Sequence, residues 1–395
     1  METDKTHRNH PHLSLTRTAA ALSFAAVALL TAPSSQLLLL FPSAFGIENK
    51  NNIPTTAVSL TDGNNGSTAT SAAANGTTAP ADFNIAAVGD WGCTSNTTNT
   101  VNNIVSRDPE LVLGLGDYSY QNSADCWFGI VDPIIGKMII AIGDHEHDVP
   151  GEGENPELLD EYMNRFGLEQ QYYTYRYGNA FVLVMSEEVP FDEDSEQFDF
   201  VVNSLSEASS DPDVDWIIVL SHTPFYNSPG VRTDRDALRN IYHELFEEND
   251  VDLVLSGDVH NYERSVPILF NDDESDSPIP TSTNGSTYVD PEGQIFATVG
   301  TGGKSIHEFR GMNPYIVTQF EGYGFLDIRI TTTADDGGGE KRLVGTFYDN
   351  DGGEIQDQFT VIKEEVEEED EEEDVVVEEE DEEDEEDDVV LEEEE

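Results

Sequence analysis

The amino-acid sequence predicts an α/β fold, because apolar strands alternate with amphipathic helices from residue 83 to about residue 255. One of these strands, at 111–115, runs into Gly116 and then into a polar stretch. After Pro267 the sequence is β-rich, which predicts an antiparallel continuation and a second sheet stacked on the first. Ligands of α/β folds gather beyond the carboxyl ends of the strands, so the polar residues at those ends are the first candidates for function.

The predicted elements follow one another along the chain. Strands are expected at 85–88, 111–115, 137–142, 172–177, 180–185, 216–220 and 251–255. Helices are expected at 97–107, 158–166, 198–208 and 234–248. In the β-rich region, strands are expected at 294–299, 315–320, 324–330, 342–348 and 358–362.

The chain is strongly acidic, with 81 acidic and 18 basic residues and a net charge of -63. Residues 364–395 hold 25 of the acidic residues, and the other 56 still outnumber the basic ones. Nucleic acids and anionic membranes are bound by clustered Lys and Arg, so neither is an expected partner. The segment 364–395 is predicted to be a disordered acidic tail that solvates the protein or collects cations. Docking to a basic protein or a mineral surface is the alternative.

The N-terminal region, 1–47, is typical of an export signal. Basic residues precede an apolar run at 18–32, and a second apolar patch at 37–41 is followed by small residues. A cleaved signal peptide is expected, and an uncleaved anchor, which would be the protein's contact with a membrane, is the alternative. Either one predicts a secreted or cell-surface protein.

Residues 48–82 are rich in Asn, Thr, Ser, Gly and Ala and are predicted to be a flexible linker. Folded sequence begins at Phe83. Cys93 and Cys126 are the two cysteines of the chain. In an exported protein they could form a disulfide that joins the loops after the first two strands; two free or buried thiols are the alternative.

Five polar clusters occur at the ends of predicted strands. They are Gly89-Asp90-Trp91-Gly92, Gly116-Asp117-Tyr118-Ser119-Tyr120, Gly143-Asp144-His145-Glu146, Ser221-His222 and Gly257-Asp258-Val259-His260. A single Asp in such a place is as often a helix cap or a turn residue. Capping, however, does not require histidines and a tyrosine, whereas a pair of metal cations requires oxygen and nitrogen donors from several strands. The set therefore predicts a metal site.

In this order the clusters resemble the five motifs of the calcineurin-like metallophosphoesterases. Tyr120, three residues after Asp117, is similar to the purple acid phosphatase branch, as are the stretches 261–264 and 298–303. The resemblance covers about 83–363, and it implies a four-layer α/β/β/α sandwich of two stacked mixed sheets flanked by helices. Together with the predicted export signal, it implies an exported phosphoric-ester hydrolase, above all an acid phosphatase acting on small phosphomonoesters. Phosphodiesterase and nucleotidase are variants of the same expectation.

The resemblance implies a role for each candidate residue. The first metal would be bound by Asp90, Asp117, Tyr120 and His260. The second metal would be bound by Asp117, Asp144, His222 and Asp258. The phenolate of Tyr120 favours Fe(III) at the first position, with a visible charge-transfer colour.

Asp117 and His145 are the residues that the resemblance places in catalysis. Asp117 would bridge the metal pair, on which a hydroxide would attack phosphorus. His145 would hydrogen-bond the phosphate or protonate the leaving group. The alternative is that His145 only orients a ligand.

Two residues depart from the family pattern, and both belong to the second metal. The family usually has Asn at the position of Asp144 and His at the position of Asp258. Four carboxylates and a phenolate then place a charge of about -5 around a metal pair of about +5, where the usual set gives about -3. We therefore expect Mn, Mg, Fe(II) or Ca rather than Zn in the second position. A catalytically weak or inactive scaffold that binds cations at the cell surface is the alternative function.

Two basic residues, Arg264 and Lys304, accompany the later motifs. Either one could attract an anionic substrate. A structural ion pair is the more common role for such a residue.

Overall fold

The computed structural model describes residues 56–58, 71–73, 82–149, 153–230, 236–333 and 339–364. The predicted signal or anchor and the acidic tail beyond Glu364 lie outside these residues, as does most of the predicted linker. Two strands, β1 (Thr56–Val58) and β2 (Ser71–Ala73), do lie within the linker, and β2 pairs in parallel with the edge of a sheet. Six residues of the predicted linker therefore form β-strands.

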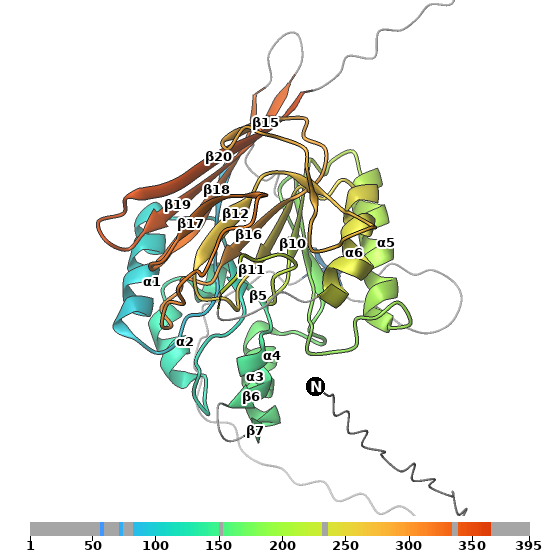
Figure 1. The fold of residues 1–395 in the computed structure, drawn as a ribbon. Coiled ribbons are helices and arrows are strands. Elements are labelled where there is room, and N and C mark those ends of the chain that lie inside the picture. Colours follow the sequence, from blue (N-terminus) through green and yellow to red (C-terminus); the bar gives the residue numbers. More distant parts are fainter. Residues whose placement is uncertain are drawn as a thin grey trace, which may run out of the picture. The chain divides into compact units, whose positions relative to one another are not determined.

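Two mixed sheets form the centre of the described region (Figure 1). The nine-stranded sheet has the order β1-β2-β8-β9-β10-β11-β16-β12-β17, with β8 (Tyr173–Tyr177), β9 (Ala180–Val184), β10 (Trp216–Leu220), β11 (Leu253–Ser256), β12 (Tyr262–Ser265), β16 (Ile295–Val299) and β17 (Ile316–Phe320). The seven-stranded sheet has the order β15-β20-β19-β18-β3-β4-β5, with β3 (Phe83–Val88), β4 (Leu111–Leu115), β5 (Met138–Ala141), β15 (Thr287–Val289), β18 (Gly324–Thr333), β19 (Glu340–Asp349) and β20 (Ile355–Glu364). The predicted pair of mixed sheets is confirmed.

The division of strands between the sheets differs from the prediction. β3, β4 and β5 pair in parallel, but β3 also pairs antiparallel with β18, so strands from both ends of the domain share one sheet. β16, β12 and β17 complete the other sheet beside β11. The prediction of a separate sheet after Pro267 is thus wrong. Strands that are apolar on both faces, such as β3, carry no local signal for the partner beside them.

Helices flank the sheets on both sides. They are α1 (Ser95–Arg107), α2 (Asp125–Val131), α3 (Asp144–His147), α4 (Pro156–Phe166), α5 (Glu196–Ser210) and α6 (Asp236–Glu248). Figure 1 shows α1 and α2 on one side of the sheets and α5 and α6 on the other. The four predicted helices are confirmed to within a few residues, whereas the short α2 and α3 were not predicted. In the described ranges, none of the helices combines the length and the apolar character needed to cross a bilayer.

Caps explain where the predicted helices begin. The side chains of Thr94, Asn155 and Ser195 accept backbone N–H groups at the starts of α1, α4 and α5. Short connections are formed by the 3₁₀ turn η1 (Ile135–Lys137) and by two small strand pairs, β6 (Asp148–Val149) with β7 (Gly153–Glu154) and β13 (Ile268–Leu269) with β14 (Ile279–Pro280).

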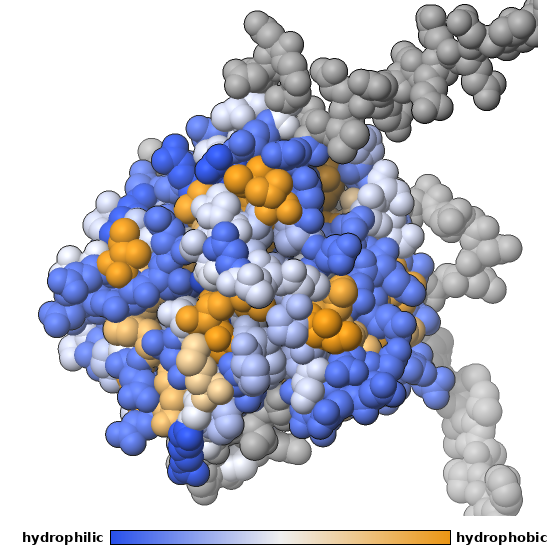
Figure 2. All heavy atoms as spheres, turned by 45° about the horizontal axis from the view of Figure 1, so that its top comes forward, coloured by the Kyte–Doolittle hydropathy of each residue, from blue (hydrophilic) through white to orange (hydrophobic). Residues whose placement is uncertain are grey.

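The core consists of strands that are buried along their whole length. All residues of β4, β5, β10, β11 and β16 are buried. Helices on one face and the second sheet on the other cover these strands, which explains their continuous apolar sequences. On the face shown in Figure 2, hydrophilic side chains cover most of the surface and apolar ones form small separate groups. Polar candidate residues follow four of these buried strands, β4, β5, β10 and β11.

The buried histidine of α6, His243, should make the fold sensitive to acid. The hydroxyl of Tyr226 lies 2.7 Å from its Nδ1, and burial lowers the pKa of His243 from 6.5 to about 4. Between these pH values the unfolded chain binds a proton that the folded protein excludes, so the free energy of unfolding decreases as the pH falls. We expect the melting temperature of metal-free His243→Gln to fall less between about pH 7 and about pH 5 than that of the wild type. Equal decreases would contradict this assignment.

Candidate metal centre

The candidate residues occupy an unusual backbone conformation at the strand ends. The φ angles of Asp90, Asp117, Tyr120, Asp258 and His260 are 57°, 57°, 54°, 65° and 54°. They are five of the eight non-glycine residues with positive φ in the part of the chain that the structure describes. This conformation costs on the order of 1 kcal/mol per residue and gathers at functional sites. The surrounding fold therefore holds these five side chains against their local preference.

Glycines allow the strand ends to approach one another. Gly116, with a φ of 87°, precedes Asp117, and a Cβ at this position would collide with the imidazole of His222. A Cβ at Gly300 would lie 2.6 Å from Asp90 Oδ2 and 2.7 Å from the backbone nitrogen of His260. Any side chain at either position would separate the clusters.

The first cluster contains Asp90, Tyr120 and His260. The Tyr120 hydroxyl lies 3.1 Å from Asp90 Oδ1 and 3.0 Å from His260 Nε2. His260 Nε2 lies 3.1 Å from the same Asp90 oxygen. Loops that follow β3, β4 and β11 thus bring an oxygen from a carboxylate, an oxygen from a phenol and a nitrogen from an imidazole together.

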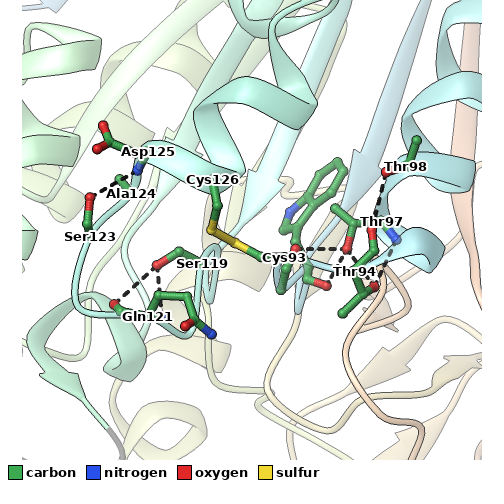
Figure 3. The surroundings of a disulfide bond; sticks show 12 residues. Cys93, Thr94, Thr97, Thr98, Ser119, Gln121, Ser123, Ala124, Asp125 and Cys126 are labelled. Atoms are coloured by element: carbon green, nitrogen blue, oxygen red, sulfur yellow. Dashed lines mark hydrogen bonds between the residues drawn. A yellow bond between two sulfur atoms is a disulfide. The ribbon is translucent and has the colours of Figure 1, made fainter.

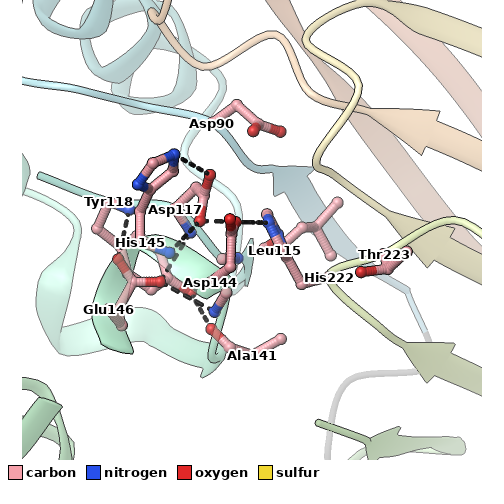
Figure 4. A network of polar contacts seen from close by, with 12 residues as sticks. Asp90, Leu115, Asp117, Tyr118, Ala141, Asp144, His145, Glu146, His222 and Thr223 are labelled. Atoms are coloured by element: carbon pink, nitrogen blue, oxygen red, sulfur yellow. Dashed lines mark hydrogen bonds and ion pairs between the residues drawn. The ribbon is translucent and has the colours of Figure 1, made fainter. Parts of the chain in front are cut away.

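The second cluster contains Asp117, Asp144, His222 and Asp258. His222 Nε2 lies 3.2 Å from Asp117 Oδ1 and 3.5 Å from Asp144 Oδ1. In Figure 4 the side chains of Asp117, Asp144 and His222 point toward one another. Three groups of residues could each hold a metal ion, because the ligand atoms inside each group lie within 4.8 Å of one another. They are Asp90-Asp117-His222, Asp117-Asp144-His145 and Asp144-His222-Asp258. Asp117, Asp144 and His222 each belong to two of these groups, and of the two carboxylates Asp117 is the fully buried one.

The two histidines present the ring nitrogen that a metal ion requires. His222 Nδ1 lies 2.7 Å from the carbonyl oxygen of Leu115, and His260 Nδ1 lies 2.8 Å from that of Ser305. A carbonyl can only accept, so each Nδ1 carries a hydrogen and each Nε2 faces the carboxylates, where its lone pair would bind a metal ion that displaces the proton. This arrangement fits a metal pair. The sequence did not identify Leu115 and Ser305 as the residues whose carbonyl groups orient the two histidines.

Buried carboxylate oxygens also fit bound cations. Asp90 Oδ2, Asp117 Oδ2 and Asp144 Oδ1 are buried without a hydrogen-bond partner among the described residues. A buried carboxylate that lacks partners is destabilising unless a cation neutralises it. The donor set of oxygens and imidazole nitrogens is the one that hard and intermediate metal ions prefer.

Protons are bound strongly where the cations would lie. Burial alone would lower the pKa of His222, but the charge of Asp117 and hydrogen bonds with Asp117 and Asp144 raise it well above its usual value. Burial and the charge of Asp90 raise the pKa of Tyr120 well above 10. Metal ions would have to displace these protons, so metal affinity is expected to increase with pH.

Glu146 is a buried residue whose role the sequence did not reveal. Its carboxylate accepts the backbone N–H groups of Asp117, Tyr118 and Gly143 at 2.8, 2.8 and 3.0 Å. Burial and the Asp117 charge raise the pKa of Glu146 to about 8. Glu146 therefore joins the loops after β4 and β5 and fixes the backbone of Asp117. Its position between two histidines was the available signal.

His145 lies at the edge of the second cluster. Its backbone N–H donates to Asp117 Oδ1 at 3.0 Å, and its Nε2 lies 3.8 Å from Asp117 Oδ2. Its ring centroid is 4.4 Å from that of Tyr120. His145 thus both orients Asp117 through its backbone and leaves its imidazole next to both clusters (Figure 4).

The predicted disulfide between Cys93 and Cys126 is present (Figure 3). Their Cα atoms are 6.0 Å apart. Cys93 follows Asp90 by three residues, and Cys126 lies in α2, beyond Tyr120. The expected bridge between the segments after the first two strands is confirmed, and it joins the parts of the chain that carry Asp90 and Tyr120.

Replacing Cys93 and Cys126 with Ser is expected to lower the free energy of unfolding by about 2 to 4 kcal/mol. The bridge closes a sequence separation of 33 residues, and removing it restores that entropy to the unfolded chain. Urea unfolding of the variant measures the effect, and wild-type protein treated with a reductant should match the variant. Unchanged unfolding midpoints would show that the folded loops do not depend on the bridge.

Arg264 is a structural residue. Its side chain is buried, its Nε donates to Asp357 Oδ2 at 2.6 Å, and its Nη1 donates to the Tyr288 hydroxyl at 3.0 Å. The structural alternative is therefore correct for Arg264.

Comparisons with known proteins identify the domain. Residues 83–262 match the family described as calcineurin-like phosphoesterase. Purple acid phosphatase 15 of Arabidopsis thaliana is 24% identical over 255 residues, which cover 55% of this chain and 44% of that protein. Another Arabidopsis protein, named probable inactive purple acid phosphatase 1, is 26% identical over 295 residues, which cover 67% of this chain and 46% of that protein. The chain spans about half the length of the curated relatives it matches.

A solved structure supports the same fold. The purple acid phosphatase PPD1 from yellow lupin (Lupinus luteus) seeds aligns with a TM-score of 0.58 and 23% identity, over 71% of this chain and 54% of that one. The predicted sandwich of two mixed sheets with flanking helices is thus confirmed. Residues 83–262 are therefore a calcineurin-like phosphoesterase domain, and the chain is similar to purple acid phosphatases.

Proposed function

We propose that this chain is a metal-dependent phosphoric-ester hydrolase of the acid phosphatase type, acting on small phosphomonoesters. The observation that supports it most is the convergence of carboxylate and imidazole groups from separate strand ends within 4.8 Å. Phosphodiesters and nucleotides are variants of the substrate within the same proposal.

The assignment of residues follows the two clusters. The first ion, Fe(III), would be bound by Asp90, Asp117, Tyr120 and His260. The second ion, Mn, Mg, Fe(II) or Ca rather than Zn, would be bound by Asp117, Asp144, His222 and Asp258. When bound, the two cations would supply Lewis-acid activation of the phosphoryl group and of water.

The side chains and backbone of the protein would orient the metal ligands and supply a proton to the leaving group. The carbonyl groups of Leu115 and Ser305 keep the histidines in the tautomer described above, and Glu146 holds the backbone of Asp117. His145 would hydrogen-bond the phosphoryl group or donate a proton to the leaving oxygen. Its place beside Asp117 supports this role.

An extracytoplasmic location is part of the proposal. The disulfide between Cys93 and Cys126 is typical of oxidising compartments. The predicted export signal, outside the described residues, agrees with that location.

Hydrolysis assays on purified protein test the function. We expect p-nitrophenyl phosphate to be hydrolysed faster than its bis ester after Fe is added together with Mn or Mg, with less activity when Zn replaces them. A visible absorption band on Fe(III) loading would support ligation by Tyr120. No turnover of either ester with any metal would contradict the proposal.

A non-catalytic cation-binding scaffold is the second candidate. The carboxylates of Asp144 and Asp258 favour it, because they reduce the positive charge available to a phosphate. The relative named as probable inactive shows that the branch includes proteins for which no activity is expected. Cation binding by intact, correctly folded protein, without turnover, would support this candidate.

A further inference from the structure

Lys304 lies at the edge of the first cluster. Its Nζ is 3.6 Å from the centroid of the Tyr120 ring, and its side chain is half-buried. A lysine in this position faces both the phenol and the solvent. It follows the glycines of the 298–303 stretch in the connection between β16 and β17.

Three hydrogen bonds fix the segment that carries Lys304. The backbone N–H of Lys304 donates to the carbonyl oxygen of Asp90 at 2.9 Å. The carbonyl of the next residue, Ser305, accepts from His260, and the N–H of His307 donates to the carbonyl of His260 at 3.0 Å. The ring of His307 also stacks on that of His260, with centroids 4.2 Å apart. The backbone position from which the Lys304 side chain extends is therefore fixed beside the first cluster.

The negative charge of the metal ligands suggests a role for the ammonium group of Lys304. Burial lowers the pKa of Lys304, and the charges of Asp117 and Asp90 oppose that shift by favouring the ammonium form. Two buried basic side chains outside the clusters are engaged elsewhere, because Arg264 pairs with Asp357 and Arg239 pairs with Asp236. With four carboxylates and a phenolate around two cations, the centre itself would attract an anion weakly. A fixed lysine next to the centre would restore that attraction.

We propose that Lys304 binds the phosphate group of the substrate and supplies the positive charge that the carboxylate-rich centre lacks. The inference rests on the proposed function. The chemistry that it recognises is a tetrahedral dianion, such as inorganic phosphate or the phosphoryl group of a monoester. Its ammonium acts from beside the Tyr120 ring, outside the ligand set of either metal.

The binding of inorganic phosphate to the full-length, metal-loaded protein tests the proposal. Lys304→Met removes the charge and keeps the side-chain length, and Lys304→Arg keeps the charge. Lys137→Met is the matched control, because Lys137 pairs with exposed Asp108 at 2.7 Å. We expect Lys304→Met to raise the dissociation constant for phosphate about tenfold, equivalent to about 1.4 kcal/mol. Lys304→Arg should stay within about threefold of the wild type, and the control should be unchanged.

Metal analysis and kinetics separate a binding role from a structural one. All four proteins should contain equal metal, and Lys304→Met should raise KM more than it lowers kcat. Loss of metal in both Lys304 variants, or wild-type phosphate affinity in Lys304→Met, would overturn the proposal, as would absence of phosphate binding by the wild type. Normal hydrolysis with unchanged affinity in Lys304→Met would refute only this inference. Lys304-dependent phosphate binding without turnover would support it and refute the proposed hydrolase.

Discussion

Asp117→Asn is expected to reduce phosphoric-ester hydrolysis at least about 100-fold and to lower the metal content. Replacing even an outer partner of a metal ligand costs about 10- to 100-fold, and Asp117 lies in two of the three groups of possible ligand atoms. Its Oδ1 is 3.2 Å from His222, and its Oδ2 has no hydrogen-bond partner among the described residues. An amide at this position would have less charge and one fewer oxygen donor. Hydrolysis of p-nitrophenyl phosphate and elemental analysis measure the two effects.

Asp327→Asn is the matched control for this substitution. Asp327 lies on β18, is buried, and belongs to none of the possible metal groups among the described residues. Burial raises its pKa to about 6, so below that pH its carboxyl group already resembles a neutral amide. The control should retain metal and activity. An Asp117→Asn variant with full metal content and full activity would refute the bridging role.

The double substitution Asp144→Asn with Asp258→His is expected to raise hydrolysis with Zn in the second position about tenfold or more. It replaces two carboxylates with neutral groups, so the charge around the metal pair changes from about -5 to about -3. A more positive centre would attract a phosphate dianion more strongly and make bound water more acidic. An imidazole also suits zinc better than a second carboxylate does.

Elemental analysis of the wild type and the variants measures which metal occupies the second position. Wild-type protein offered equal Fe, Mn, Mg and Zn should contain little zinc, whereas the double variant should contain about one zinc per chain. Either single variant should lie between them, since each changes one charge. Stoichiometric zinc in the second position of the wild type would contradict the argument from charge.

The strand ends and the residue types at them were predictable, because both are local properties of the sequence. A run such as Leu111–Leu115 is buried throughout, and Gly116 before Asp117 marks its end. Carboxyl ends of parallel strands meet at one edge, so side chains far apart along the chain were expected to converge. The contacts of Asp117 with His222 and of Asp90 with His260 agree with that expectation.

The α/β class, the order of the polar clusters and the residue types in them can be read from the amino-acid sequence alone. Tertiary structure decided which strands share a sheet, because β3 and β18 pair across almost the whole domain. It also decided the surroundings of the clusters, such as the carbonyls of Leu115 and Ser305 and the ammonium of Lys304. Every residue has a carbonyl group, and most lysines lie on surfaces. Their roles here arise only from long-range packing, which leaves no periodic or local pattern along the chain.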